Sequence, residues 1–261
     1  KYFNTLFATI LAIIQGLTEF LPISSSAHLL IPSKLFGLDD LGLFFDISVH
    51  AGTLVAVIFY FRNSLLKIIN SFFFLKVNSK DFRFGLNLII STLPIVFITI
   101  FFEDLILLRN SSLYSIGVVN LIFASLLFLT FVFSKKNKTL HEITFLGALF
   151  IGLFQAFAIF PGASRSGVVI TSALILGLTL KHGSKYAFIL SIPTILGALV
   201  FLIKNITSFE SYDLFIISLG FIISAIIAFL TIKTFLSFID KIGMMPFIYY
   251  RIFLGILLLI L

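Results

Sequence analysis

Long apolar runs separated by short polar segments dominate the pattern of this chain. A helix rises about 1.5 Å per residue, so roughly 20 apolar residues cross the ~30 Å hydrocarbon core of a bilayer. The spans predicted on this basis cover residues 43–61, 84–102, 113–133, 186–203, 214–236 and 248–261. The pattern therefore predicts an all-α polytopic membrane protein with six spans.

Two shorter helix pairs interrupt this series. The stretch 2–21 is followed, after a serine cluster, by the apolar stretch 27–36, which at about 1.5 Å per residue covers only half a bilayer. The stretches 144–160 and 167–180 repeat this arrangement. We predict two re-entrant hairpins, because irregular backbone at membrane depth is tolerated only inside protein or beside a wet cavity. Two full spans per pair would leave the later loops on the same sides, but the shortness of 27–36 argues against them.

The chain also contains an internal repeat. Residues 15–28 and 155–167 both read as an apolar helix with a glutamine, then phenylalanine, proline, a serine cluster and a second apolar stretch. Repeats of approximately 1–137 and 138–261 follow, within a single transmembrane domain over 1–261. Each repeat holds one hairpin and three spans. Because three is odd, the two repeats are expected to have inverted topology, as in many transporters.

The distribution of charge orients this topology. Loops 62–83, 134–143, 179–185 and 233–247 together carry twelve basic residues against three acidic ones, whereas the opposite side carries four basic and six acidic residues. Loops rich in lysine and arginine stay in the cytoplasm. Both termini are therefore expected on the outer side of the membrane.

Composition excludes several other classes of protein. Hydrophobic residues make up 60% of the chain and charged residues 11%, whereas about a quarter of a soluble domain is charged. The net charge of +7 is explained by the cytoplasmic loops, so no nucleic-acid partner is expected. The chain has no cysteine, which excludes disulfides and thiolate chemistry. Gln15 and Glu19 within the first apolar stretch argue against a cleavable signal peptide.

Few ionisable side chains remain within or near the membrane: Glu19, His28, Asp46, His50, Arg165 and Arg251. Ionisable residues at membrane depth are costly and point to function. Glu19 and Arg165 lie at equivalent turns and are predicted to face each other, with a purely structural ion pair as the alternative. Arg251, at the start of the last span, is expected to reach the cytoplasmic headgroups.

Serine clusters stand directly before both short helices. They comprise Ser24, Ser25 and Ser26 in the first hairpin, and Ser164, Arg165, Ser166 and Gly167 in the second. A helix start presents free N–H groups and a positive dipole end to an anion, although a serine there can also be a simple helix cap. An arginine adds bidentate binding of phosphate. The two clusters together predict a site for a diphosphate-sized anion.

Three further side chains are candidates beside these serines. Gln15 and Glu19 are four residues apart on one helix face and offer oxygen ligands for Mg²⁺ or Ca²⁺. His28 follows Ser25 by three positions, so it can reach the serine cluster as a base or a nucleophile. The alternative for His28 is a hydrogen bond between helices. Gln155, the counterpart of Gln15, is expected to bond between helices.

At these residues the chain resembles the undecaprenyl-pyrophosphate phosphatase family, the bacitracin-resistance membrane phosphatases. The first family motif matches Gln15, Glu19, the run 20–25 and His28, and the second matches Pro161–Gly167 at every fixed position. The resemblance covers nearly the whole chain. Three positions depart from the usual pattern, namely Gln15 for glutamate, Ala27 for glycine and His50 for glutamine.

The resemblance implies hydrolysis of undecaprenyl pyrophosphate to the monophosphate at the outer face of a bacterial plasma membrane. That reaction recycles the lipid carrier for peptidoglycan synthesis and opposes bacitracin. The implied roles are a metal ligand or base for Glu19 with Gln15, a pyrophosphate clamp for Arg165 with the serines, and a nucleophile for Ser25 assisted by His28. Direct attack by His28 is the runner-up. The implied partners are the polyprenyl pyrophosphate and membrane lipids, and a homodimer is left open.

A secondary transporter or lipid flippase is the main competing hypothesis. Inverted repeats, broken helices and a midplane anion site are typical of transporters. A carrier, however, has no need of a nucleophile beside a base. A channel would need rings of charge along a pore, which this chain lacks.

Overall fold

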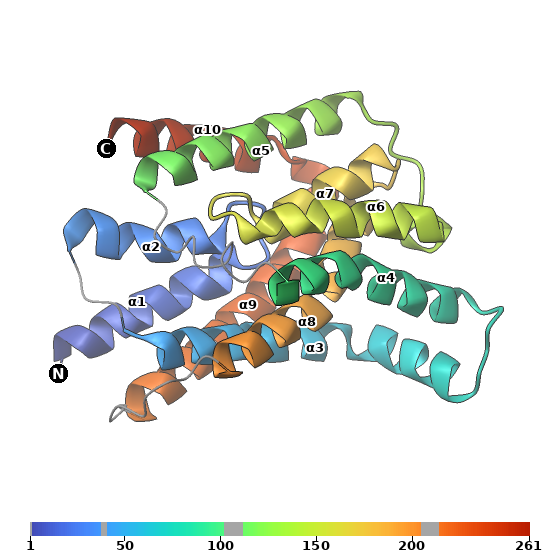
Figure 1. Ribbon diagram of the computed structural model, residues 1–261, viewed down its shortest axis with the longest axis horizontal. Coiled ribbons are helices and arrows are strands. Elements are labelled where there is room, and N and C mark those ends of the chain that lie inside the picture. Colours follow the sequence, from blue (N-terminus) through green and yellow to red (C-terminus); the bar gives the residue numbers. More distant parts are fainter. Residues whose placement is uncertain (1, 38–40, 102–111, 205–213) are drawn as a thin grey trace.

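The protein is almost entirely helical (Figure 1). The computed structural model describes residues 2–37, 41–101, 112–204 and 214–261, and these form ten α-helices and two short 3-10 helices. The first half contains α1 (Tyr2–Thr18), α2 (Ser25–Phe36), α3 (Leu43–Phe73), α4 (Lys80–Phe101) and α5 (Leu113–Phe133). The second half contains η2 (Leu140–Glu142), α6 (Phe145–Ala156), η3 (Phe157–Ile159), α7 (Arg165–Ile175), α8 (Leu180–Lys204), α9 (Leu214–Ile242) and α10 (Met245–Ile260).

Five of the described helices, α3, α4, α5, α8 and α9, are long and apolar enough to cross a membrane. They confirm that the chain is a polytopic helical membrane protein, as the apolar runs predicted. The sixth predicted span corresponds to α10, which has 16 residues and so a length of about 24 Å. Helix α3 continues twelve residues beyond the predicted span at residue 61, because its polar last turns remain helical outside the apolar run.

Several polar side chains are buried inside this bundle, and many large apolar side chains are exposed on its outside. Gln15, Asn120, Gln155 and Arg251 are completely buried, while Phe97 and many other apolar side chains are exposed. Gln155 Nε2 donates to the Ser91 carbonyl and its Oε1 accepts from Thr194, so its predicted interhelical role is confirmed. Such a distribution fits a lipid solvent, in which exposed apolar surface costs nothing and polar groups must be paired internally.

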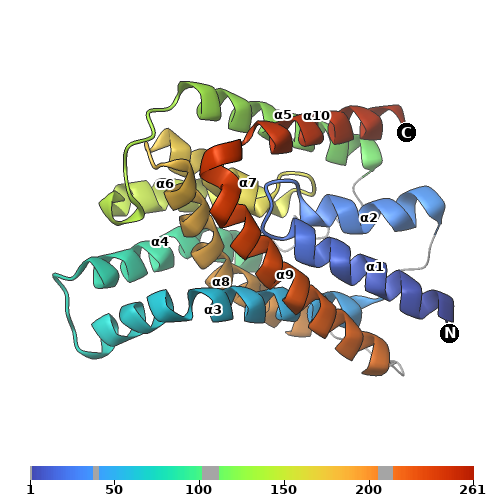
Figure 2. The ribbon, with the colours of Figure 1, turned by 180° about the vertical axis from the view of Figure 1, so that it is seen from behind.

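The most extensive helix packing joins helices of different halves of the chain. Both α1 and α3 pack on α9, α6 packs on α4, and α5 lies along α10 (Figures 1 and 2). Small residues permit the close crossings: a Cβ on Gly16 of α1 would lie 2.7 Å from Ile227 Cβ of α9, and a Cβ on Gly117 of α5 would lie 3.0 Å from the Gly255 carbonyl of α10. Glycine at such crossings is the usual basis of helix packing in membranes.

Two helical hairpins, α1–α2 and α6–α7, meet at their turns in the middle of the molecule. The turns are joined directly, since Ser166 Oγ donates to the Leu21 carbonyl at 2.9 Å. Phe20, beside this contact, is fully buried against Phe188 of α8 at 5.4 Å between ring centres. The functional residues predicted from the two serine clusters are therefore brought to one place.

Candidate active site

The two turns have the same unusual backbone. Ser24 has φ 72° and ψ 92°, and Ser164 has φ 67° and ψ 105°. Residues other than glycine rarely adopt positive φ, and such strain persists where the surrounding structure determines it. The two serines that directly precede the short helices α2 and α7 thus share one strained conformation. The strain is concentrated at the point where each short helix begins.

Each of these serines also caps the helix that follows it. Ser24 Oγ accepts from the Ala27 N–H at 3.4 Å, and Ser164 Oγ accepts from the Gly167 N–H at 3.2 Å. The hydroxyls of Ser24 and Ser26 are 3.2 Å apart, and those of Ser164 and Ser166 are 3.3 Å apart. The predicted helix starts at both clusters are therefore confirmed. Capping accounts for one N–H at each start and leaves the dipole ends of α2 and α7 in the centre of the protein.

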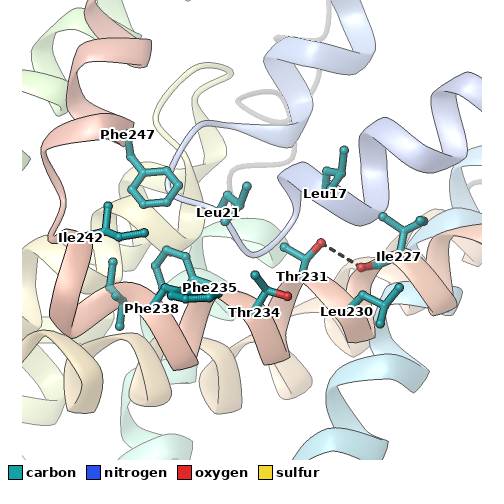
Figure 3. A pocket seen from close by; sticks show the side chains of 11 residues that line it. Leu17, Leu21, Ile227, Leu230, Thr231, Thr234, Phe235, Phe238, Ile242 and Phe247 are labelled. Carbon is teal, nitrogen blue, oxygen red and sulfur yellow. Dashed lines mark hydrogen bonds between the residues drawn. The ribbon is translucent and has the colours of Figure 1, made fainter.

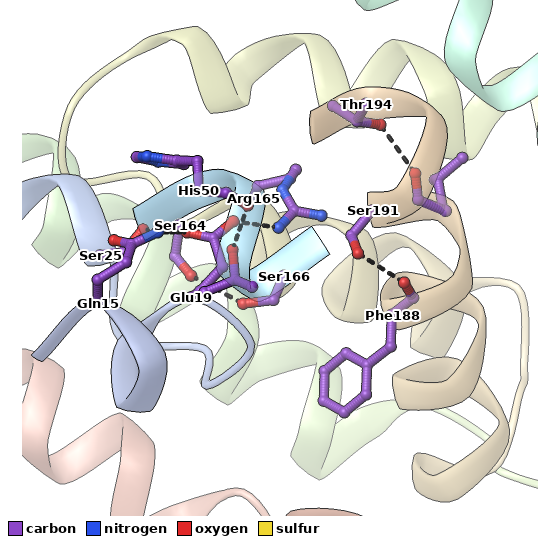
Figure 4. A network of polar contacts seen from close by, with 12 residues as sticks. Gln15, Glu19, Ser25, His50, Ser164, Arg165, Ser166, Phe188, Ser191 and Thr194 are labelled. Atoms are coloured by element: carbon purple, nitrogen blue, oxygen red, sulfur yellow. Dashed lines mark hydrogen bonds and ion pairs between the residues drawn. The ribbon is translucent and has the colours of Figure 1, made fainter. Parts of the chain in front are cut away.

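An ion pair links the first hairpin to the second (Figure 4). Arg165 Nη2 lies 2.5 Å from Glu19 Oε1, so the predicted encounter of the acid and the base is confirmed. The other carboxylate oxygen, Glu19 Oε2, accepts from Ser25 Oγ and from Gln15 Nε2, both at 2.9 Å. Glu19 is buried and Ser25 partly so. One carboxylate thereby organises residues of both hairpins.

His28 is oriented by partners other than Ser25. Its Nδ1 is 2.7 Å from the Ser24 carbonyl, and its Nε2 is 2.6 Å from the hydroxyl of Tyr250, whose ring stacks on the imidazole. A carbonyl can only accept, so Nδ1 carries a proton and a neutral imidazole accepts the Tyr250 hydroxyl at Nε2. The Ser25 hydroxyl donates its hydrogen bond to Glu19 and not to His28.

Arg251 occupies a different place from the predicted one. Its side chain is completely buried, and it donates to the Asn120 side chain at 2.8 Å and to the carbonyls of Gly162 and Ala163 at 2.9 and 3.0 Å. The prediction that it reaches the headgroups was wrong. Position near a helix start suggested an exposed charge, but Asn120 of α5 and the second turn supply enough oxygen acceptors to hold a guanidinium inside.

Gln15 offers a test of the predicted metal site. Its Oε1 is buried and has no hydrogen-bond partner among the described residues, which is unusual for a completely buried amide. An unpaired oxygen beside a carboxylate is the donor type that Mg²⁺ or Ca²⁺ prefers. The described residues contain no cluster of three or more His, Cys, Asp or Glu that could hold a metal. The pair Gln15 and Glu19 therefore fits an ion whose other ligands come from substrate or water.

The candidates thus form one site. The residues that the structure brings together are Gln15, Glu19, Ser24, Ser25, His28, Ser164, Arg165, Ser166 and Gly167. Ser26 adjoins them but is exposed. His50 of α3 lies next to the site in Figure 4, and its Nδ1 bonds to the Asp46 carbonyl at 2.8 Å.

Sequence reasoning missed Asn120 and Tyr250. Asn120 had a signal, since it is a polar residue in the middle of the apolar run 113–133. Tyr250 was not assigned a role, because tyrosine is common near a membrane interface. Asn120 reaches the site through the packing of α5 against α10, and Tyr250 through the contact of α10 with His28 of α2. Pattern alone predicts neither contact.

An apolar groove adjoins the first turn on the outside of the bundle (Figure 3). It has a volume of about 400 Å³ and lies between α1, α9 and the start of α10. Leu17 and Leu21 line one wall, and Thr234, Phe235 and Phe247 belong to the other walls. Leu21 is also the residue whose carbonyl binds Ser166. Leu21 therefore contributes both to the wall of the groove and to the contact between the two turns.

The fold and the paired turns define a polytopic helical membrane protein with a polar site buried between two helix starts. The model of the family described as bacitracin resistance protein BacA matches residues 8–257, and the chain belongs to this family. A relative from Alcanivorax borkumensis named undecaprenyl-diphosphatase is 42% identical over 257 residues, 97% of each chain. A relative of the same name from Teredinibacter turnerae is 42% identical over 96% of this chain and 97% of its own. Undecaprenyl-diphosphatase 1 of Pseudoalteromonas translucida is 38% identical over 96% of both chains.

Proposed function

We propose that this protein hydrolyses undecaprenyl pyrophosphate to undecaprenyl phosphate and inorganic phosphate. The observation that carries the proposal is the meeting of two capped helix starts around the Glu19–Arg165 ion pair and the Ser25 hydroxyl. Membership of the BacA family and the names of its relatives support the same activity. The activity recycles the lipid carrier for peptidoglycan synthesis and confers bacitracin resistance.

Arg165 and the two helix starts bind the pyrophosphate in this proposal. Arg165 uses one terminal nitrogen for Glu19, and its guanidinium makes no other hydrogen bond to the described residues, so its remaining donors can bind phosphate oxygens. Further contacts to the pyrophosphate are assigned to Ser24, Ser26, Ser164, Ser166 and the Gly167 backbone, which belong to the same two turns. Phosphoryl transfer requires mainly positioning and neutralisation of charge, and helix dipoles with an arginine supply both.

Ser25 is the proposed nucleophile. Its Oγ attacks the terminal phosphorus, the bond from that phosphorus to the bridging oxygen breaks, and undecaprenyl phosphate leaves with the bridging oxygen. Glu19 Oε2, 2.9 Å from Oγ, accepts the proton, so the base role passes from His28 to Glu19. Water then cleaves the phosphoserine and releases inorganic phosphate. His28 fixes the turn through the Ser24 carbonyl rather than acting on Ser25.

A divalent cation, Mg²⁺ or Ca²⁺, is proposed as cofactor. Gln15 Oε1 and the Glu19 carboxylate would hold it, and the unpaired state of Gln15 Oε1 supports this assignment. When bound, such an ion would neutralise charge on the pyrophosphate oxygens. Gln15 contributes no charge of its own, so the site would hold the ion with one carboxylate.

The topology proposed for the membrane is two inverted repeats with two re-entrant hairpins. What supports it is that α1 and α6 run to the centre from opposite ends of the molecule, as Figure 1 shows. The packing is also reciprocal, since α1 contacts α9, the fourth helix of the second half, and α6 contacts α4, the fourth helix of the first.

Both termini and the active site are proposed to face outward from a bacterial plasma membrane, because basic residues gather in the opposite loops. Most charged residues of the outward side lie outside the described residues. They are Lys1, Asp39, Asp40, Glu103, Asp104, Arg109, Glu210 and Asp213.

The prenyl chain is proposed to occupy the groove between α1, α9 and α10. The groove is lined almost entirely by carbon, and Leu21 connects it to the turn that carries Ser24 and Ser25. A lipid with its pyrophosphate between the turns would therefore find an apolar wall directly beside them.

Analysis of both products tests the proposed function. Purified protein in detergent is given undecaprenyl pyrophosphate, and lipid and phosphate are quantified with Mg²⁺ or with EDTA. The proposal predicts equal amounts of undecaprenyl phosphate and inorganic phosphate, with release that requires the metal. Arg62→Ala, an exposed change in the second half of α3, is the matched control for Arg165→Ala. A folded wild type that yields neither product would overturn the proposal and favour a transporter.

A further inference from the structure

Arg251 is the most deeply buried cation among the described residues, and it touches both hairpin turns. Its Nη2 donates to the carbonyls of Gly162 and Ala163, and its Nη1 lies 3.4 Å from the carbonyl of Pro22. One side chain from α10 thus bonds to the turn of the first hairpin and to that of the second. Every partner that the described residues give it is an uncharged oxygen.

Asn120 holds this guanidinium in a fixed orientation. Asn120 Oδ1 accepts from Arg251 Nε at 2.8 Å, while Asn120 Nδ2 donates to the Arg251 carbonyl at 2.6 Å. The Asn120 carbonyl accepts a further bond from Nη2 at 3.3 Å. Asn120 of α5 and Arg251 of α10 therefore each use both the side chain and the backbone carbonyl in hydrogen bonds to the other.

The glycine of the second motif is explained by the same contact. A Cβ on Gly167 would lie 2.8 Å from Arg251 Nη1, closer than such atoms approach. The guanidinium is bonded on several sides and cannot easily move away. Gly167 therefore makes room for Arg251 at the first turn of α7, in addition to its backbone N–H bond to Ser164.

The orientation of a carbonyl also fixes the amide on the same peptide. In a trans peptide the C=O and the N–H point in opposite directions, and no cis peptide occurs among the described residues. Because the Ala163 carbonyl points to Arg251, the Ser164 N–H points away from it. The contact with Arg251 therefore fixes the direction of the Ser164 N–H at the start of α7.

We propose that Arg251 is a positioning residue for the pyrophosphate site, and that it holds the two turns together and orients the backbone N–H groups at the start of α7. The inference rests on the proposed function. Preorganised donors act most strongly on charge that develops in the transition state, and loss of one such donor costs about a hundredfold in rate. Loss of Arg251 should therefore lower kcat more than it raises KM.

The test compares Arg251→Met and Arg251→Lys with Asn87→Leu in detergent-purified, monodisperse protein. Asn87 is a matched control, because it is buried and ties α4 to the Ile143 carbonyl away from both turns. We expect kcat for phosphate release to fall about a hundredfold in Arg251→Met with KM changed less than about threefold. Arg251→Lys retains some of the donors and should recover part of the loss. Asn87→Leu should lower the melting temperature but not the kcat of folded protein.

If the wild type releases phosphate and the kcat of Arg251→Met is within about twofold of the wild-type value, the inference is overturned and the proposed function remains intact. A wild type that releases none would overturn both. If Arg251→Met does not fold, Asn120→Leu removes the orienting bonds without removing the charge. Its kcat should fall while that of Asn87→Leu does not, and equal kcat values for these two variants would overturn the inference.

Discussion

Glu19 and Arg165 are 146 residues apart in sequence and 2.5 Å apart in space, between Oε1 and Nη2. This contact joins the first hairpin to the second at the turns where α2 and α7 begin. The same carboxylate also accepts from Ser25, so the electrostatic link between the halves and the proposed nucleophile share one residue. Either half of the chain by itself would hold an unpaired charge at membrane depth, which is costly.

The strained serine caps provide a prediction about stability. At Ser24, with φ 72°, alanine loses the cap and keeps the strain, whereas glycine adopts this φ freely and loses only a few tenths of a kcal/mol as a cap. Ser24→Ala should therefore be less stable than Ser24→Gly by about 1 kcal/mol, as measured by denaturation in detergent. Ser112 caps α5 with an ordinary φ of −68° and is the control. An equally large preference for glycine at Ser112 would contradict the role assigned to strain.

Much of this site could be predicted from the sequence because its polar and charged residues stand within apolar stretches. Glu19 and Arg165 are charges in apolar stretches, and the serine clusters interrupt helices, so both signals are local. Arg251 was also an exception, but its burial depends on α5 packing against α10, which is a long-range relationship. The span boundaries were accurate for Leu113–Phe133 and too short for Leu43–Phe73, because hydropathy registers the membrane and not the end of the helix.

The departure at Gln15 predicts a change in metal dependence. Gln15→Glu adds a second carboxylate beside Glu19 and replaces the neutral oxygen proposed as a metal ligand with a charged one. Mg²⁺ should then reach half-maximal activation at a lower concentration, because charge on oxygen ligands strengthens binding of hard cations. Gln15→Leu should require more Mg²⁺ than the wild type. Identical activation curves for all three proteins would remove Gln15 from the metal site.

Filling the apolar groove should affect long lipids more than short ones. Thr234→Trp places a large ring in the groove beside Phe235, so KM for undecaprenyl pyrophosphate should rise while KM for farnesyl pyrophosphate changes little. Ile226→Trp adds the same ring to a neighbouring exposed face of α9 and is the control. Equal effects of the two variants on both substrates would exclude this groove as the site of the prenyl chain.

The absence of native cysteine makes orientation directly measurable. Ser112→Cys, at the exposed start of α5, should react with a membrane-impermeant maleimide added to intact cells or spheroplasts. Asn137→Cys, in the exposed basic loop after α5, should react only after permeabilisation. The opposite pattern would reverse the proposed orientation and place the basic loops outside.

The rate of phosphate release from undecaprenyl pyrophosphate by wild type, Ser25→Ala, Arg165→Ala and the double variant tests the central claim most directly. If residues of both hairpins act on one phosphoryl group, each single variant should lose at least about a hundredfold in kcat. The kcat of the double variant should then be only slightly lower than that of the less active single variant. If the two decreases in kcat multiply in the double variant, or if one single variant has a normal kcat, the two hairpins do not form one shared site. A folded wild type that releases no phosphate would contradict the account as a whole.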